Sequence, residues 1–286
     1  MHKETIKFEF NAAVQEALEH FPELRTDTTF YNLKSDKIIK APEYREKMLR
    51  PLWQTYGRAK ASETISNPDT GMQIMLFHPN ENKPLGINDG SFEFDHELAH
   101  LIANKQNLYQ ASSKLYNENL ADAFATIRQI QRLGNAGLED LKRINIFRSL
   151  QEITGKANDY LTSPVISQII TDSEQEEFKK LSLTETFNKA VEYTQKTSIN
   201  KEAYELLKAE YKPFEKMETT EEMLKLLSST CLSSENSAVF ISGAQVVLHH
   251  TAKENAEWQE VHSALEQKAA ELQVTHLIKN FSSPSF

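Results

Sequence analysis

Two short motifs constrain the fold of this chain more than any other feature of its sequence. The chain reads HELAH from His96, which is an HExxH pattern, and NENLAD from Asn117, which is an NExxAD pattern. Residues four apart on a helix lie on one face, so His96 and His100 are predicted to point the same way. The same spacing puts Glu118 and Asp122 on one face of a second helix. The sequence therefore predicts a pair of helices that brings imidazoles and carboxylates together.

These residue types are the ones that a hydrolytic zinc site needs. Two imidazoles at HExxH spacing can hold one Zn²⁺, and a catalytic zinc takes a third protein ligand and leaves its fourth position to water. Glu118 is the predicted third ligand. Glu97 is turned about 100° around the helix from His96, so it is predicted to stay outside the ligand set and act as the general base on water. Asp122 is predicted to accept a hydrogen bond from the outer ring nitrogen of a ligand histidine.

The segments around the motifs fit two packed helices. The 17 residues 101–117 separate His100 from Glu118. They leave room for the first helix to end near 104–106, for a loop through 107–113, and for the second helix to run back past the first. Apolar residues at helical spacing are predicted to bury one side of each helix. They are Leu98, Leu101 and Ile102 in the first helix, and Leu115, Leu120, Phe124, Ile127 and Ile130 in the second.

Each of these polar residues also has an ordinary structural interpretation. Histidine and glutamate are common on the solvated face of an amphipathic helix, and the chain contains nine histidines. Glu118 fits an acid near a helix N-terminus, and Asp122 fits a solvated helix charge. Asp95 is interpreted as a cap of the first helix or as an acid at its positive end. The occurrence of both motifs at a workable distance favours the metal site.

HELAH followed by NENLAD resembles the gluzincin pattern of zinc metallopeptidases, HExxH followed by NExxSD or ExxxD, as in thermolysin-like enzymes. The resemblance covers only residues 92–130. By this resemblance, His96, His100 and Glu118 bind zinc. It also implies that Glu97 is the general base and that Asp122 orients a histidine ligand. Ala121 stands where the family usually has serine, and the spacer is slightly shorter, but neither change removes a ligand.

The whole chain is similar to host-directed effector metalloproteases of intracellular bacteria in its size, its Gly-poor composition and the place of its HExxH motif. One such effector cleaves actin. The similarity implies a zinc endopeptidase that acts on a host cytoskeletal protein such as actin. The N-terminus lacks the apolar run of a secretory signal. We therefore expect translocation, if the chain is exported, by a route that needs no Sec signal.

Composition narrows the class of protein. The 286 residues are 39% hydrophobic and 26% charged, as in a soluble globular protein. The net charge of −9 argues against non-specific binding of nucleic acid, and no stretch approaches the roughly 20 apolar residues of a membrane span. Cys231 is the sole cysteine. It excludes an intrachain disulfide, indicates a reducing compartment such as cytosol, and is interpreted as a packing residue.

The expected fold class is α+β and predominantly α-helical. We predict a zincin-like core over 1–134, made of a small sheet and the active-site helix, and a helical lobe over 135–279 that forms the other side of the cleft. Residues 280–286 are predicted to be a loose tail. Residues 72–78 are the best strand candidate. The resemblance implies an edge strand that receives substrate as an added strand, whereas an ordinary core strand is the alternative.

Other elements follow from hydrophobic periodicity. An alternating segment over 6–10 is predicted to be a strand, and helices are predicted over 11–21, 42–61, 137–155, 158–171 and 173–197, with further helices from 199 to 273. Tyr109 and Tyr116 lie in or beside the spacer and are candidate donors to an oxyanion. His249, His250 and His262 are weaker candidates. The alternative function is a non-catalytic helical interaction protein whose metal site is structural or vestigial.

Overall fold

The computed structural model describes residues 8–33, 37–39, 62–66, 72–78, 90–108, 114–134, 162–172 and 175–197, single positions between 137 and 148, and positions 263 and 267. Statements about the structure apply to these residues. The elements are α1 (Phe10–His20), η1 (Pro22–Arg25), β1 (Thr28–Asn32), β2 (Lys37–Ile39), β3 (Glu63–Ser66), β4 (Gln73–Phe77), α3 (Ser91–Lys105), α4 (Lys114–Leu133), α6 (Ser163–Thr171), α7 (Gln175–Phe178) and α8 (Leu183–Thr197). The predicted α+β class, mostly helical with a small sheet, is confirmed.

The four strands of the described residues form one mixed sheet in the order β2-β1-β4-β3. β1 and β4 are parallel, with Phe30 opposite Met75, and the outer strands pair antiparallel to them. The strand predicted at 72–78 is confirmed as β4. The prediction that it lies at the sheet edge is wrong, because β3 and β1 flank it on both sides. Its continuous run of apolar residues suits a central strand that is covered on both faces.

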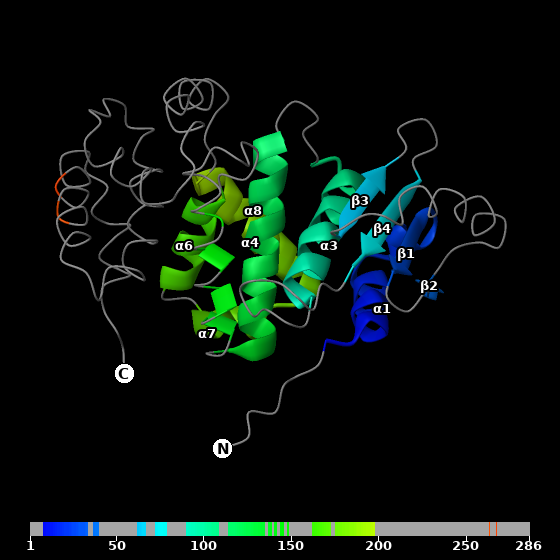
Figure 1. Cartoon of the computed structure of the whole chain (residues 1–286), viewed down its shortest axis with the longest axis horizontal. Helices are drawn as coiled ribbons and strands as arrows, with labels where there is room; N and C mark the ends of the chain where they lie inside the picture. Colours follow the sequence, from blue (N-terminus) through cyan, green and yellow to red (C-terminus); the bar gives the residue numbers. More distant parts are fainter. Residues whose placement is uncertain are drawn as a thin grey trace, which may run out of the picture.

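Helix α3 lies against this sheet (Figure 1). Its fourth residue, Phe94, is fully buried and packs edge-on against Phe10 of α1 and Phe77 of β4, with ring centroids 5.7 and 5.9 Å apart. Aromatic contacts of this kind anchor the first turn of α3 over the sheet. Gly90 precedes the helix with a φ of 73°, a left-handed conformation that suits glycine because it has no Cβ.

Asp95 does not cap α3. The helix begins four residues earlier, at Ser91, and Asp95 is fully buried within it. The interpretation of Asp95 as a cap of the helix or as an acid at its positive end is therefore wrong. Its carboxylate is paired with arginine side chains of α4.

Helix α4 packs antiparallel along α3, as predicted for the second motif helix. The order of contacts shows this direction, because Ser91 reaches Gln129 near the start of α3 and His100 reaches Glu118 near its end. The five apolar residues expected to be buried on α4 are all buried. Burial extends almost all the way around this helix, because α6 and α8 cover the side that faces away from α3.

In Figure 1, α4 lies in the middle of the described elements: α3 and the sheet are on one side of it, and α6 and α7 are on the other. A single hydrophobic cluster runs from Phe10 of α1 through both motif helices to Tyr193 of α8. It therefore contains residues from both sides of position 134, and the predicted division into a core and a helical lobe stays a prediction. No helix among the described residues is long and apolar enough to span a membrane.

Several predicted elements differ from the structure or lie outside it. Phe8 and Glu9 are not in a strand and Phe10 opens α1, so this part of the strand predicted over 6–10 is wrong. The helix predicted over 173–197 is two helices, α7 and α8. Ser182, just before α8, forms a capping box in which its hydroxyl and amide contact Glu185. The segments outside the described residues are the predicted helix 42–61, most of 137–155, the helices beyond 199 and the tail 280–286.

Candidate metal centre

Three side chains of the two motifs converge at the α3–α4 interface. Nε2 of His96 lies 3.2 Å from Nε2 of His100 and 3.2 Å from Oε2 of Glu118, and Nε2 of His100 lies 3.8 Å from the same oxygen. Among the described residues, this is the group of three or more histidine, cysteine or acidic side chains that can hold a metal ion. The predicted ligand set is thus brought together from two helices.

The separations fit a tetrahedral ion. Bonds of about 2.0–2.2 Å to such an ion place its ligand atoms about 3.3–3.6 Å apart. Two of the distances in this group, at 3.2 Å, are slightly shorter than that interval, and the third, at 3.8 Å, is slightly longer. His96 and Glu118 are buried, whereas His100 keeps 14% of its side-chain surface exposed. Solvent therefore reaches the group from the side of His100.

One polar atom of this group, Oε2 of Glu118, is buried and lacks an ordinary hydrogen bond from the described residues. The Nε2 atoms of His96 and His100 are 3.2 Å apart, too close for their lone pairs to face each other without a proton or a cation between them. A cation placed among the three atoms would satisfy all of them, which is the fit expected of a metal site.

Asp122 fixes the orientation of His96. Its Oδ1 lies 2.7 Å from Nδ1 of His96, and the carboxylate is fully buried. A carboxylate accepts, so we infer that Nδ1 carries a proton and that Nε2 is the ring nitrogen directed at Glu118. This is the partner relationship predicted for Asp122.

The electrostatics of the group favour a positive charge at its centre. Burial lowers the pKa of His96, but the carboxylates of Asp122 and Glu118 outweigh burial and raise the pKa to about 10. Burial raises the pKa of Glu118, but the imidazoles of His100 and His96 outweigh it and hold the pKa at about 2. In the metal-free protein a proton on His96 therefore supplies the charge that a metal ion would bring.

Two residues outside the motifs complete the surroundings of Asp122. Nε and Nη2 of Arg148 donate to the two oxygens of Asp122 at 2.8 and 3.0 Å. The hydroxyl of Thr162, just before α6, donates to Oδ2 at 2.6 Å. Burial raises the pKa of Asp122, but Arg148 and His96 outweigh it and lower the pKa well below its usual value. Sequence reasoning missed both residues, because neither belongs to a motif.

Glu97 is not a member of the converging group, and its predicted role as the base stays a prediction. Its side chain is about nine-tenths buried. Its backbone carbonyl accepts a hydrogen bond of 3.1 Å from the hydroxyl of Thr64 on β3. The strand at the sheet edge therefore touches α3 at the residue predicted to be the base.

The predicted oxyanion donors stay predictions. Tyr116 lies on α4 two residues before Glu118, its ring packs in the main hydrophobic cluster, and burial raises the pKa of its hydroxyl. Tyr109, His249, His250 and His262 lie outside the described residues.

Comparisons with protein families, with curated proteins and with solved structures found no match.

Proposed function

We propose that the chain is a zinc-dependent endopeptidase of the gluzincin type, with a zincin-like core formed by the sheet, α3 and α4. One observation carries the proposal. The Nε2 atoms of His96 and His100 and the Oε2 atom of Glu118 converge at distances that suit one tetrahedral ion. The third ligand comes from the second motif and another helix, so the pattern is more specific than HExxH alone.

Each residue of the motifs has a chemical task in this proposal. His96, His100 and Glu118 would hold Zn²⁺, which when bound supplies a Lewis acid that acidifies water and polarises a carbonyl. Glu97 would accept the proton of the attacking water and pass it to the leaving amine. Asp122 would hold His96 in the tautomer whose Nε2 is free to bind.

The proposed substrate is a protein segment in extended conformation. β3 is an edge strand of the sheet among the described residues, and it contacts α3 at Glu97. Glu63 and Ser66 of β3 are exposed, while Thr64 and Ile65 are partly buried. A peptide added along β3 would run beside the proposed base. A cytoskeletal substrate such as actin follows only from the effector resemblance and stays a prediction.

The proposal is tested with the full chain and a lysate. Purified protein is analysed for bound metal and then incubated with cell lysate with and without a chelator, and new protein termini are identified by mass spectrometry. Chelator-sensitive termini that are absent with the Glu97→Ala variant are the expected result. A tight complex between the chain and a lysate protein, without new termini, would favour the alternative, a non-catalytic interaction protein with a structural metal site.

A further inference from the structure

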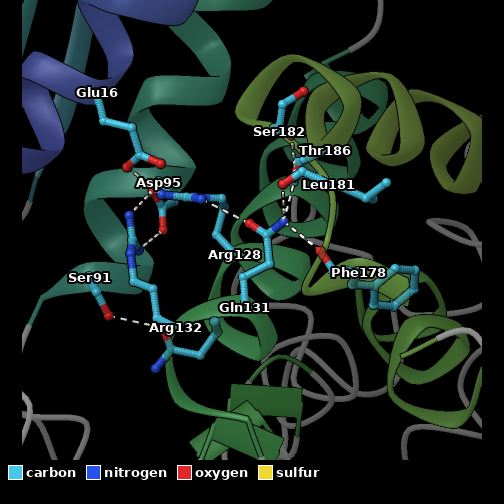
Figure 2. A network of polar contacts seen from close by, with 11 residues as sticks. Glu16, Ser91, Asp95, Arg128, Gln131, Arg132, Phe178, Leu181, Ser182 and Thr186 are labelled. Atoms are coloured by element: carbon cyan, nitrogen blue, oxygen red, sulfur yellow. Dashed lines mark hydrogen bonds and ion pairs between the residues drawn. The ribbon is translucent and has the colours of Figure 1, made fainter. Parts of the chain in front are cut away.

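Asp95 is a fully buried acid that takes no part in the proposed ligand set, although it precedes His96 directly. Both of its oxygens face Arg132 of α4. Nη2 of Arg132 donates to Oδ1 at 2.8 Å, and Nη1 contacts Oδ2. A second arginine, Arg128, approaches with its Nε 3.8 Å from Oδ1. Figure 2 shows the two arginine side chains converging on Asp95.

The arginines extend this contact into a network across five elements. Nη2 of Arg128 pairs with Glu16 of α1 at 2.6 Å, and Nη1 donates to Gln131 at 2.8 Å. Gln131 in turn donates to three oxygens that lie from the end of α7 to the first turn of α8 (Figure 2). These acceptors are the carbonyls of Phe178 and Leu181 and the hydroxyl of Thr186, at 2.7, 3.1 and 2.9 Å.

The network acts on the same two helices that carry the metal ligands. Asp95 and His96 are neighbours on α3, and Arg132 is ten residues beyond Asp122 on α4, about 15 Å along the helix axis. The contacts of Asp95 and of His96 therefore tie two adjacent positions of α3 to points well apart along α4. Two such ties fix the slide of one helix along the other as well as their rotation. A metal cage needs this accuracy, because its bond lengths tolerate deviations of only about 0.2 Å.

We propose that Asp95 and Arg132 are positioning residues that set the register of α3 against α4 and so the separation of the paired imidazoles from Glu118. This inference rests on the proposed metal site. An apolar pair would hold two helices together at least as firmly, because burying charges is expensive. A bidentate ion pair also fixes orientation, because the two oxygens of Asp95 align with the two Nη atoms of Arg132 in one arrangement only.

The test replaces the ion pair without removing its bulk. The double variant Asp95→Leu/Arg132→Met keeps apolar volume at the interface, and Arg128 retains Glu16 and Gln131 as partners. The zinc dissociation constant is measured by competition with a chromophoric chelator, and the urea midpoint is measured for the metal-free protein. We expect zinc binding to weaken about tenfold or more, with a urea midpoint no lower than that of the wild type. Zinc affinity equal to that of the wild type would overturn the inference.

Two further variants make the result decisive. Arg132→Lys keeps the charge and loses the two-pronged geometry, so it too should weaken zinc binding, and it serves if the double variant does not fold. Tyr193→Phe removes a contact with Asp172 beside α6 and should leave zinc affinity unchanged. Unaltered affinity in Arg132→Lys, or an equal loss in Tyr193→Phe, would contradict a positioning role. A wild-type chain that binds no zinc would refute the metal site itself, which separates that failure from the failure of the network.

Discussion

The Nδ1 atom of His96 lies 2.7 Å from Oδ1 of Asp122, across the interface between α3 and α4. This single contact joins the two motifs and decides which nitrogen of His96 is available to an ion. Because Asp122 is fully buried and also receives Arg148 and Thr162, its carboxylate is held in one position. The orientation of His96 therefore depends on three segments of the chain.

The first prediction concerns the ligands. The wild-type chain is expected to bind about one zinc ion tightly, measured by elemental analysis after gel filtration. His96→Ala, His100→Ala and Glu118→Ala should each lower the zinc content, because each removes one of the three converging atoms. His20→Ala is the matched control, since His20 is exposed on α1. Undiminished zinc in the three variants would exclude this ligand set.

The second prediction separates binding from catalysis. Glu97→Gln should lower the turnover of a cleaved protein by about 10²–10⁴-fold, the range typical of a lost general base. Its zinc content should equal that of the wild type, because Glu97 lies outside the converging group. Turnover is measured as the rate at which new termini appear. A variant with full activity would show that another group accepts the proton.

The third prediction concerns pH. The carboxylates beside His96 raise its pKa to about 10, so the metal-free protein carries this proton at neutral pH. Zinc must displace the proton, and zinc affinity should therefore rise as pH rises from about 6 to 9. Glu118, with a pKa of about 2, stays ionised throughout and adds no slope. Titrations with a chelator competitor at several pH values measure the slope, and an affinity that falls as pH rises would contradict the assignment.

The raised pKa of His96 also predicts how the free energy of unfolding of the metal-free chain changes with pH. A raised pKa in the folded protein stabilises it fully below the ordinary histidine value of about 6.5. This contribution is lost as the pH rises through about 10, the pKa of His96 in the fold. The unfolding free energy of the metal-free chain should therefore fall over this interval by an amount that His96→Ala does not show.

The fourth prediction concerns Asp122. Asp122→Ala removes the acceptor of Arg148 and of Thr162 and the partner of His96. The free energy of unfolding should fall by about 3–5 kcal/mol, as for other broken buried ion pairs. Zinc affinity should fall about 10–100-fold.

Thr162→Val is the control for this experiment. It removes one hydrogen bond to the same carboxylate and should cost about 1.5–3 kcal/mol. Urea unfolding and chelator competition measure both variants. If Asp122→Ala binds zinc as tightly as the wild type, Asp122 does not orient His96.

The motif spacing predicted the local arrangement well. Residues four apart must share a helix face, so the pairing of His96 with His100 and of Glu118 with Asp122 followed from geometry alone. The apolar positions predicted on α4 are all buried, although burial extends almost all the way around this helix. The antiparallel return of α4 along α3 placed Glu118 opposite the imidazoles.

The parts that the sequence did not predict depend on distant segments. Arg148 and Thr162 reach Asp122 from positions 26 and 40 residues further along the chain, and nothing in their own surroundings marks them. Asp95 resembles a helix-end acid because its arginine partners are more than 30 residues away. β4 lies inside the sheet because β3 pairs with it, and the pattern of β4 alone does not reveal its neighbours.

The most direct test is anomalous X-ray diffraction at the zinc absorption edge from crystals of the zinc-loaded chain. The account predicts one strong peak within bonding distance of Nε2 of His96, Nε2 of His100 and a carboxylate oxygen of Glu118. A zinc-loaded protein with no peak among these three atoms, or with its zinc bound elsewhere, would contradict it.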